Sequence, residues 1–256
     1  MSEALRTALT DVLDGGQLVL HYQPIVEARS GATRAVETLA RWRPRDGKLR
    51  GADWLFGRLA SHPELLPEVD RLVLAVMLEE RATFGSLGEM KISINQDRRS
   101  FSLERIRSFV DSCAGRDGGP IAVELFEHLD PEQLEAMPAL AEELADAGIE
   151  VWHDDFGTGE RALAHLIALP STIVKLCPEI AADGVESARV RRHVRSLIAM
   201  LHNLGKIVIA EGVSDAASTE WLGDAGADWF QGWHFARPMP AIEAAAWLES
   251  SEPRAA

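Results

Sequence analysis

The spacing of hydrophobic and polar residues changes character near residue 90. Before that point, segments 17–26 and 33–40 alternate apolar with polar residues, which predicts two strands joined by a turn at 29–31. Because that connection is too short for a helical crossover, the two strands are predicted to pair antiparallel. After residue 90, short apolar runs alternate with longer amphipathic segments, a rhythm typical of a parallel sheet covered by helices.

These patterns predict an irregular barrel. The predicted strands are 17–26, 33–40, 91–95, 121–125, 149–153, 172–176, 206–210 and 228–231. The predicted helices are 3–14, 52–60, 67–84, 101–114, 131–147, 161–168, 186–204, 215–225 and 240–249. Eight strands in 256 residues favour a (β/α)8 TIM-like barrel with an antiparallel first strand. An open doubly wound sheet is the alternative, and no Gly-x-Gly-x-x-Gly turn supports it.

We expect a single domain over residues 1–256, with a core at about 17–245 and a loose tail at 250–256. The net charge of −14 argues against nucleic acid or an anionic membrane as the main partner. Cys113 and Cys177 give no disulfide framework and suit a reducing compartment. No segment resembles a signal peptide or a membrane span. These features predict a cytoplasmic protein.

Two adjacent carboxylates, Asp154 and Asp155, end an apolar run and precede Gly157 and Gly159. Neighbouring acids repel each other and cost desolvation when buried together, so a cation is expected nearby. The glycines allow a sharp turn and a close approach of the backbone to a ligand. The alternative is a solvated turn in which one of the two aspartates caps a helix.

Other polar residues stand where predicted strands end, and in a barrel these ends meet at one face. Taken singly, each has a structural explanation; Lys175 and Glu211, for instance, form an ion pair in the simplest reading. Taken together, oxygen donors around one lysine suit Mg²⁺, Mn²⁺ or Ca²⁺ better than zinc, and metal-assisted phosphoester hydrolysis uses such a site. The set comprises Glu37, Asn95, Glu124, Glu127, Asp154, Asp155, Lys175, Glu211 and Gln231.

Two further expectations follow from position along the strands. His153 precedes the aspartate pair on an alternating strand, so its ring is expected to point away from the Asp154 side. Most tryptophans are expected in the core or at its rim. Trp42 and Trp233 are set apart because both are predicted to flank the mouth of the barrel.

An ordered series of motifs resembles the EAL domain, a cyclic di-GMP phosphodiesterase module. Asp154-Asp155-Phe156-Gly157-Thr158-Gly159 matches the most diagnostic motif of that family without change. The resemblance covers about residues 17–245 and implies a (β/α)8-like barrel with an antiparallel first strand. The other matching segments are Tyr22–Val26, Glu37–Trp42, Asn95, Glu124–Glu127, Lys175, Ala210–Val213, Gln231–Trp233 and Ala236–Pro238.

The resemblance implies hydrolysis of one phosphodiester bond of cyclic di-GMP to linear pGpG by a water activated by two metal ions. It assigns Mg²⁺ or Mn²⁺ as the ions, expects Ca²⁺ to bind and inhibit, and expects a homodimer. Two such ions typically sit about 3.5–4 Å apart. The implied metal ligands are Glu37, Asn95, Glu124, Asp154 and Asp155. Lys175, Glu211 and Gln231 are the implied catalytic residues, Gln23 and Arg41 contact the ligand, and Glu127 supports a loop.

Several positions depart from the family pattern. Cys177 stands where the family has an aspartate near the second metal, and a thiol is a poor ligand for Mg²⁺. Ser214 replaces the closing glutamate of the segment after Glu211. Two hypotheses therefore remain: an active phosphodiesterase, or a weak or inactive EAL domain that acts as a cyclic di-GMP receptor or a protein-interaction module. A metal-dependent barrel enzyme for another phosphodiester is a third.

Overall fold

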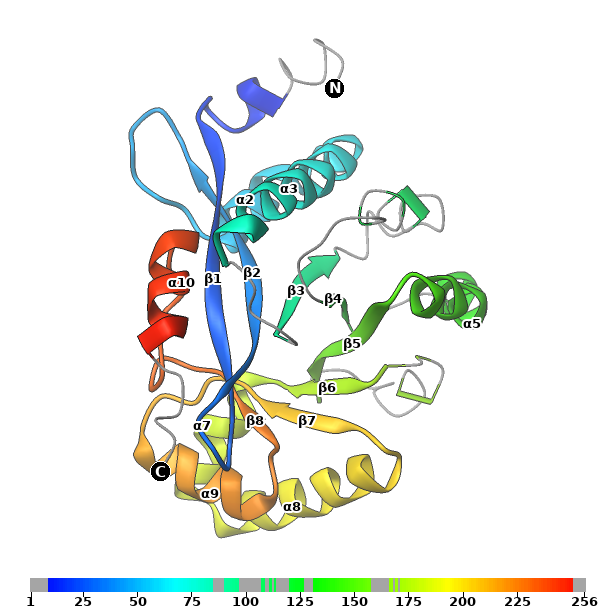
Figure 1. Cartoon of the computed structure of the whole chain (residues 1–256), viewed down its shortest axis with the longest axis vertical. Helices are drawn as coiled ribbons and strands as arrows, with labels where there is room; N and C mark the ends of the chain where they lie inside the picture. Colours follow the sequence, from blue (N-terminus) through cyan, green and yellow to red (C-terminus); the bar gives the residue numbers. More distant parts are fainter. Residues whose placement is uncertain are drawn as a thin grey trace.

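The strands close into one barrel in chain order (Figure 1). The structure is a computed structural model that describes residues 9–84, 90–96, 107–108, 111, 113, 120–126, 131–157, 166–167, 169 and 171–250. The strands are β1 (Gln17–Glu27), β2 (Thr33–Arg43), β3 (Lys91–Gln96), β4 (Ile121–Phe126), β5 (Ile149–Phe156), β6 (Ile173–Leu176), β7 (Ile207–Ala210) and β8 (Trp229–Phe230). β1 runs antiparallel to both of its neighbours, and all other pairs are parallel. The predicted barrel and its antiparallel first strand are confirmed.

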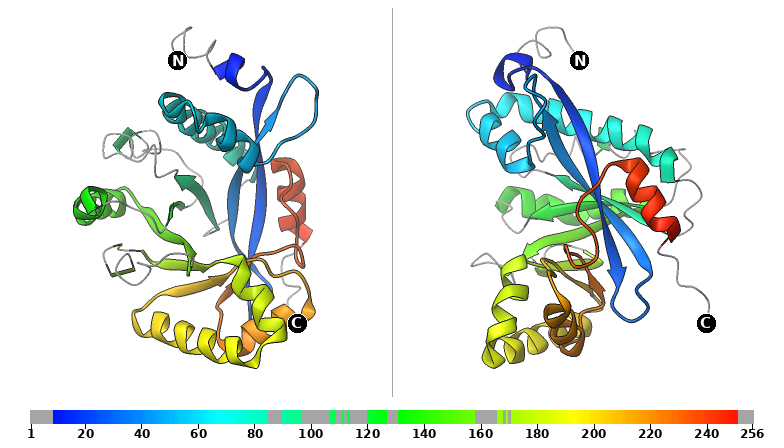
Figure 2. Two further views of the ribbon diagram at one scale, coloured as in Figure 1. Left: turned by 180° about the vertical axis from the view of Figure 1, so that it is seen from behind. Right: turned by 90° about the vertical axis from the view of Figure 1, so that its left-hand side faces the viewer.

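The helices lie outside the sheet, with α10 against β1 and α7 to α9 together at one end (Figures 1 and 2). Residues 9–12 are also helical. Predicted segments 1–8, 158–165, 251–256 and most of 101–114 lie outside the described residues. The helices are α2 (Ala52–Leu59), α3 (Leu66–Glu80), α5 (Pro131–Asp146), α7 (Pro178–Glu186), α8 (Ala188–Asn203), α9 (Ala216–Ala225) and α10 (Ala241–Ser250), with 3-10 turns at Pro63–Leu65 and Arg81–Phe84.

The long β1–β2 pair extends beyond the barrel rim. β3 pairs with β2 only from Ala35 to Thr38, whereas β1 stays paired with β2 as far as Arg43. This extension carries Trp42 away from the mouth. Its indole is 5% exposed and donates hydrogen bonds to the carbonyls of Leu13 and Gly15. The expectation that Trp42 flanks the mouth was wrong, because the ring anchors the turn after the first helix.

The helix predicted at 186–204 is confirmed as α8, and a further helix that was not predicted, α7, comes directly before it. α7 begins with Pro178 in its first turn, a position that suits proline. A second helix then starts at Ser187, whose side chain accepts a hydrogen bond from the amide of Val190. Gly184 conceals α7 in the sequence because glycine disfavours helix. Its real role is packing, since a Cβ at Gly184 would lie 2.1 Å from Cζ2 of Trp221.

The barrel interior is built in two layers. Ile25, Ala35, Ala122, Trp152, Ile173, Ile209 and Trp229 form a buried apolar cluster inside the sheet. The rings of Trp152 and Trp229 meet edge to face with their centroids 6.3 Å apart. We call this cluster the apolar floor. Side chains on a strand alternate between faces, so the residue two positions beyond each floor residue also points inward.

We expect Gly184→Ala to lower the free energy of unfolding by about 1–3 kcal/mol, although alanine is the better helix former, because the methyl group overlaps the Trp221 ring. Gly57→Ala in α2 is the matched control. Nothing lies within 4 Å of a Cβ there, so alanine should raise stability by about 0.5–1 kcal/mol. Urea unfolding of both variants measures the difference. Equal stabilisation by both would contradict the packing role.

Candidate active site

A polar layer sits directly above the apolar floor, at the carboxyl ends of the parallel strands. On β2 and β4 to β8, each member lies two residues after a floor residue, as the alternation requires. On β1 the order is reversed because that strand is antiparallel, so Gln23 precedes Ile25. β3 contributes Asn95. The polar layer comprises Gln23, Glu37, Asn95, Glu124, Asp154, Lys175, Glu211 and Gln231.

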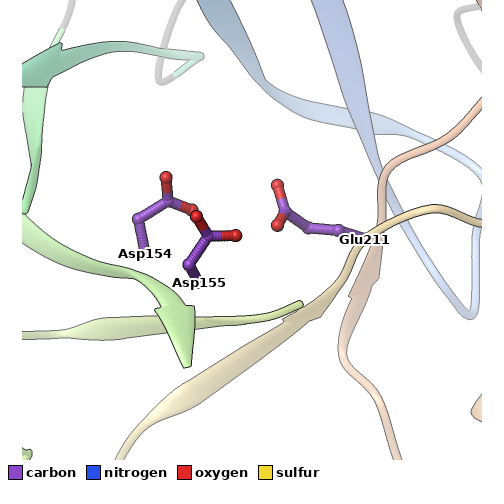
Figure 3. A group of neighbouring side chains, drawn as sticks. All are labelled: Asp154, Asp155 and Glu211. Atoms are coloured by element: carbon purple, nitrogen blue, oxygen red, sulfur yellow. The ribbon is translucent and has the colours of Figure 1, made fainter. Parts of the chain in front are cut away.

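A β-bulge brings both members of the aspartate pair to the site. His153 pairs with Val174 and Phe156 with Leu176, so β5 holds one extra residue across this step. Asp155 takes up the extra residue with a φ of 53°, a left-handed conformation that is costly for a residue other than glycine. Oxygens of Asp154, Asp155 and Glu211 all lie within 4.8 Å of one another (Figure 3). Simple alternation would have turned Asp155 away.

His153 lies on the other side of β5. Its ring packs edge-on against Phe156 with centroids 5.3 Å apart, and Phe156 belongs to the apolar cluster beneath α7 to α9. This arrangement agrees with the expectation that His153 points away from Asp154.

Lys175 is the cation that the paired carboxylates demand. Its side chain is 1% exposed. Its Nζ lies 2.8 Å from Glu124 Oε2, 2.8 Å from Glu211 Oε1, 3.0 Å from Asp154 Oδ1 and 3.6 Å from Glu37 Oε2. Burial alone would lower the pKa of Lys175, but the four carboxylates raise it well above its usual value. Lys175 therefore stays charged at neutral pH.

The carboxylates respond to burial in different ways. Burial raises the pKa of Glu124 and Asp154, raises that of Glu211 to about 8, and raises that of the half-buried Asp155 to about 6 with the Asp154 charge adding to it. Burial also acts on Glu37, but Lys175 and hydrogen bonds from Gln231 and Asn95 outweigh it and lower its pKa. One ammonium thus faces more negative charge than it can neutralise.

The donor set suits a hard divalent cation. Carboxylate oxygens dominate the site, and such oxygens are the ligands that Mg²⁺, Mn²⁺ and Ca²⁺ prefer. Glu124 Oε1 is buried and has no hydrogen-bond partner among the described residues, so an acceptor is left for a cation. Asp154, Asp155 and Glu211 form the cluster close enough to share one ion. The residues present therefore fit a metal at this position.

Amide side chains fix the far side of the layer. Asn95 and Gln231 each donate to a different oxygen of Glu37. Gln231 also donates to Gln23 Oε1, and Gln23 donates to the carbonyl of Ala236 over 3.1 Å. This network links the loop after β8 to β1 and to β2.

The remaining predicted residues lie at the rim or outside the description. Arg41 is half-buried on β2, donates to the carbonyl of Ala40, and lies close enough to Glu37 for their charges to interact. Glu127 lies outside the described residues. The sequence analysis included Gly232 in a matching segment but gave it no role, and in the structure a Cβ there would lie 1.9 Å from the carbonyl oxygen of Val213. Glycine is needed there for the loops after β7 and β8 to touch, and its place in a Gln-Gly turn was the available signal.

Cys177 and Ser214, the two notable departures from the motif pattern, have different surroundings. Cys177 is buried at the start of α7, and burial raises the pKa of its thiol to about 11, with Glu179 and Asp155 adding to the shift. It is therefore protonated at neutral pH and contributes no charge. Ser214 is exposed.

In the described part of the chain, no helix combines the length and apolar character needed to cross a membrane.

Comparisons with known proteins agree on one family. The family model described as "EAL domain" matches residues 2–238. The chain is 30% identical over 250 residues to cyclic di-GMP phosphodiesterase PdeR of Escherichia coli (strain K12), covering 96% of this chain and 37% of PdeR. It is 30% identical over 246 residues to cyclic di-GMP phosphodiesterase NbdA of Pseudomonas aeruginosa, covering 94% of this chain and 31% of NbdA. The chain spans less than half the length of either relative.

A solved structure named "PaMucR Phosphodiesterase, c-di-GMP complex" matches with a TM-score of 0.82 at 27% identity. The match covers 94% of this chain and 99% of that chain. The similarity in fold therefore extends over most of this chain.

Lys175→Met should destabilise the metal-free protein by about 3–5 kcal/mol, because it leaves buried carboxylates without their cation. These carboxylates must then bind protons in the folded state, so their folded pKa values exceed the unfolded ones. Proton binding to these carboxylates therefore stabilises the folded state at low pH, and this stabilisation is lost as the pH rises above about 4.5, the pKa of the carboxylates in the unfolded chain. Thermal unfolding at pH 5 and pH 8 should show a larger deficit at pH 8.

The matched control for this variant is Lys206→Met. Lys206 is partly buried but donates to the carbonyl of Ser171 and makes no ion pair among the residues that the structure describes. The Lys206→Met variant should therefore not make the stability deficit larger at pH 8 than at pH 5. A Lys175→Met variant as stable at pH 8 as at pH 5, relative to the unmodified chain, would show that Lys175 does not hold the carboxylates together.

Proposed function

The chain belongs to the EAL domain family, and from that premise we propose that it hydrolyses cyclic di-GMP to linear pGpG. The observation that carries the proposal is the buried ammonium of Lys175 among four carboxylates, beside the Asp154, Asp155 and Glu211 cluster. The names of the relatives PdeR and NbdA support the substrate.

The polar layer is proposed to hold two Mg²⁺ or Mn²⁺ ions. Glu37, Asn95, Glu124 and Asp154 would hold the first ion, and Asp154 and Asp155 the second, with Glu211 close by. When bound, divalent ions acidify a water and neutralise charge on a phosphate. Ca²⁺, with its larger and looser coordination sphere, is proposed to bind and inhibit.

The protein's own groups orient the reaction. Lys175 holds its proton and directs a fixed positive charge at the attacking water and the phosphate, a form of electrostatic stabilisation. Gln231, itself bonded to Glu37 and Gln23, positions the water. The water oxygen bonds to one phosphorus, the bond from that phosphorus to the 3′ oxygen breaks, and the proton lost by the water is balanced by the proton that the 3′ oxygen takes up as it becomes a hydroxyl, which opens the ring to pGpG. Gln23 and Arg41 are proposed to hold the ligand, Arg41 through a phosphate.

Assembly and location complete the proposal. A homodimer is expected from the family, and a cytoplasmic location fits the two free cysteines. The acidic net charge of −14 argues against a nucleic-acid partner. Glu127 is proposed to support the loop after β4, as in the resembling motif.

A receptor that binds cyclic di-GMP without turnover is the second candidate, and Cys177 and Ser214 favour it. Calorimetric titration of cyclic di-GMP with Ca²⁺ present, followed by a product assay in Mg²⁺ and in Mn²⁺, separates the two. We expect binding in Ca²⁺ and pGpG formation in the other metals, with Glu37→Ala as the inactive control. Binding without product above that control would establish the receptor instead.

Cys177→Asp is expected to raise turnover or tighten metal binding, because it adds a carboxylate near Asp155 where the thiol is neutral. Initial rates over a range of Mg²⁺ and Mn²⁺ concentrations measure both quantities. Cys177→Ser is the matched control, since it removes the thiol without adding charge. An equal gain from both variants, or no gain from either, would show that a missing carboxylate does not limit the site.

A further inference from the structure

We propose that Trp233 and Arg237 form a shelf at the rim of the barrel on which one purine base of the cyclic dinucleotide stacks. The inference rests on the proposed function and extends it to the recognition of the base. It starts from an unusual exposure: Trp233 is 62% exposed, and it is the one large aromatic side chain among the described residues that stands out in solvent.

Arg237 holds the Trp233 ring in place. The guanidinium carbon of Arg237 lies 3.9 Å from the ring centroid, within the range of a cation–π contact. The guanidinium therefore covers one face of the indole, and the high exposure of the residue leaves the opposite face free. A flat aromatic surface that is held from behind and open in front is a stacking platform for a nucleobase.

The turn that carries Trp233 is connected to the polar layer by the chain itself at Gln231 and by a hydrogen bond from Gln23 to Ala236. Trp233 stands two residues after Gln231, a reach of about 7 Å. The amide of His234 donates to the carbonyl of Val213 over 3.0 Å, which ties the turn to the loop after β7. At the other end of the turn, Gln23 donates to the carbonyl of Ala236. Two proposed site residues, Gln23 and Gln231, thus fix the turn that carries the indole.

The chemistry of the occupant follows from this placement. Metal ions on the polar layer would hold a phosphate, and the base of the same dinucleotide would extend from it toward the rim. Stacking on the indole rewards an extended π system, and the Arg237 charge adds attraction for an anionic ligand. A cyclic dinucleotide combines these two properties, whereas a simple phosphodiester has only the charge.

Trp54 offers a contrast within the same chain. It also lies near guanidinium groups, with Arg58 5.1 Å from its ring centroid. Its ring, however, is partly buried on α2 against the apolar cluster beside β1 and β2. Trp54 is therefore packed against the core instead of standing out in solvent, and it serves as a matched control.

Calorimetric titration of cyclic di-GMP in Ca²⁺ tests the shelf. Trp233→Ala should weaken binding by about 5- to 150-fold, the equilibrium equivalent of one base stacked on an aromatic ring. Trp233→Phe should keep most of the affinity, and Trp54→Ala should leave it unchanged. With Mg²⁺ or Mn²⁺, Trp233→Ala should raise KM and leave kcat within about twofold, because a stacked base contributes equally before and during the reaction.

Tryptophan fluorescence supplies an independent readout. A base stacked on the Trp233 indole should quench its emission, so the quenching seen on titration should largely disappear in Trp233→Phe, although that variant still binds. Unchanged affinity of Trp233→Ala, in a protein that binds and hydrolyses cyclic di-GMP, would overturn the shelf and leave the proposed function intact. Failure of the unmodified protein to bind cyclic di-GMP at all would overturn both.

Discussion

A single ammonium group buried among carboxylates is the constraint on which the site depends. Lys175 is placed by β6, and the four acids around it come from β2, β4, β5 and the end of β7. No two neighbouring strands could hold this arrangement alone, because each acid repels the others and each loses hydration on burial. Closure of the barrel brings the cation and the acids together. The charge balance of the site therefore depends on formation of the complete barrel.

Strand alternation explains why the polar layer was largely predictable. Glu37, Glu124 and Lys175 each follow an apolar residue by two positions, so a reader of the sequence who places the strands correctly also places these side chains. The barrel itself was predictable for a related reason: the helix-strand rhythm after residue 90 and the short turn between the first two strands leave few topologies.

Features that depend on contacts between distant segments could not be predicted in this way. The inward turn of Asp155 requires a bulge and a left-handed backbone, and alternation points to the opposite face. α7 was missed because Gly184 weakens the helical pattern. Position 184 must be glycine because a larger side chain would overlap Trp221 of α9. Trp42 was misplaced because β2 runs past the rim before ending. In each case tertiary packing overrides the local signal.

The pairing between β1 and β8 has a mechanical consequence. Among the described residues, this seam consists of the pairs Val26 with Phe230 and Glu27 with Trp229, together with the bridge from Tyr22 to Met239. This β1–β8 ladder and the β7–β8 ladder have two residue pairs each, fewer than any other ladder of the barrel. Gln23 stands on one side of the seam and Gln231 on the other. A ligand held by Gln23 on one edge, next to a water positioned by Gln231 on the other, would link the two edges, so ligand binding would also stabilise the closed barrel.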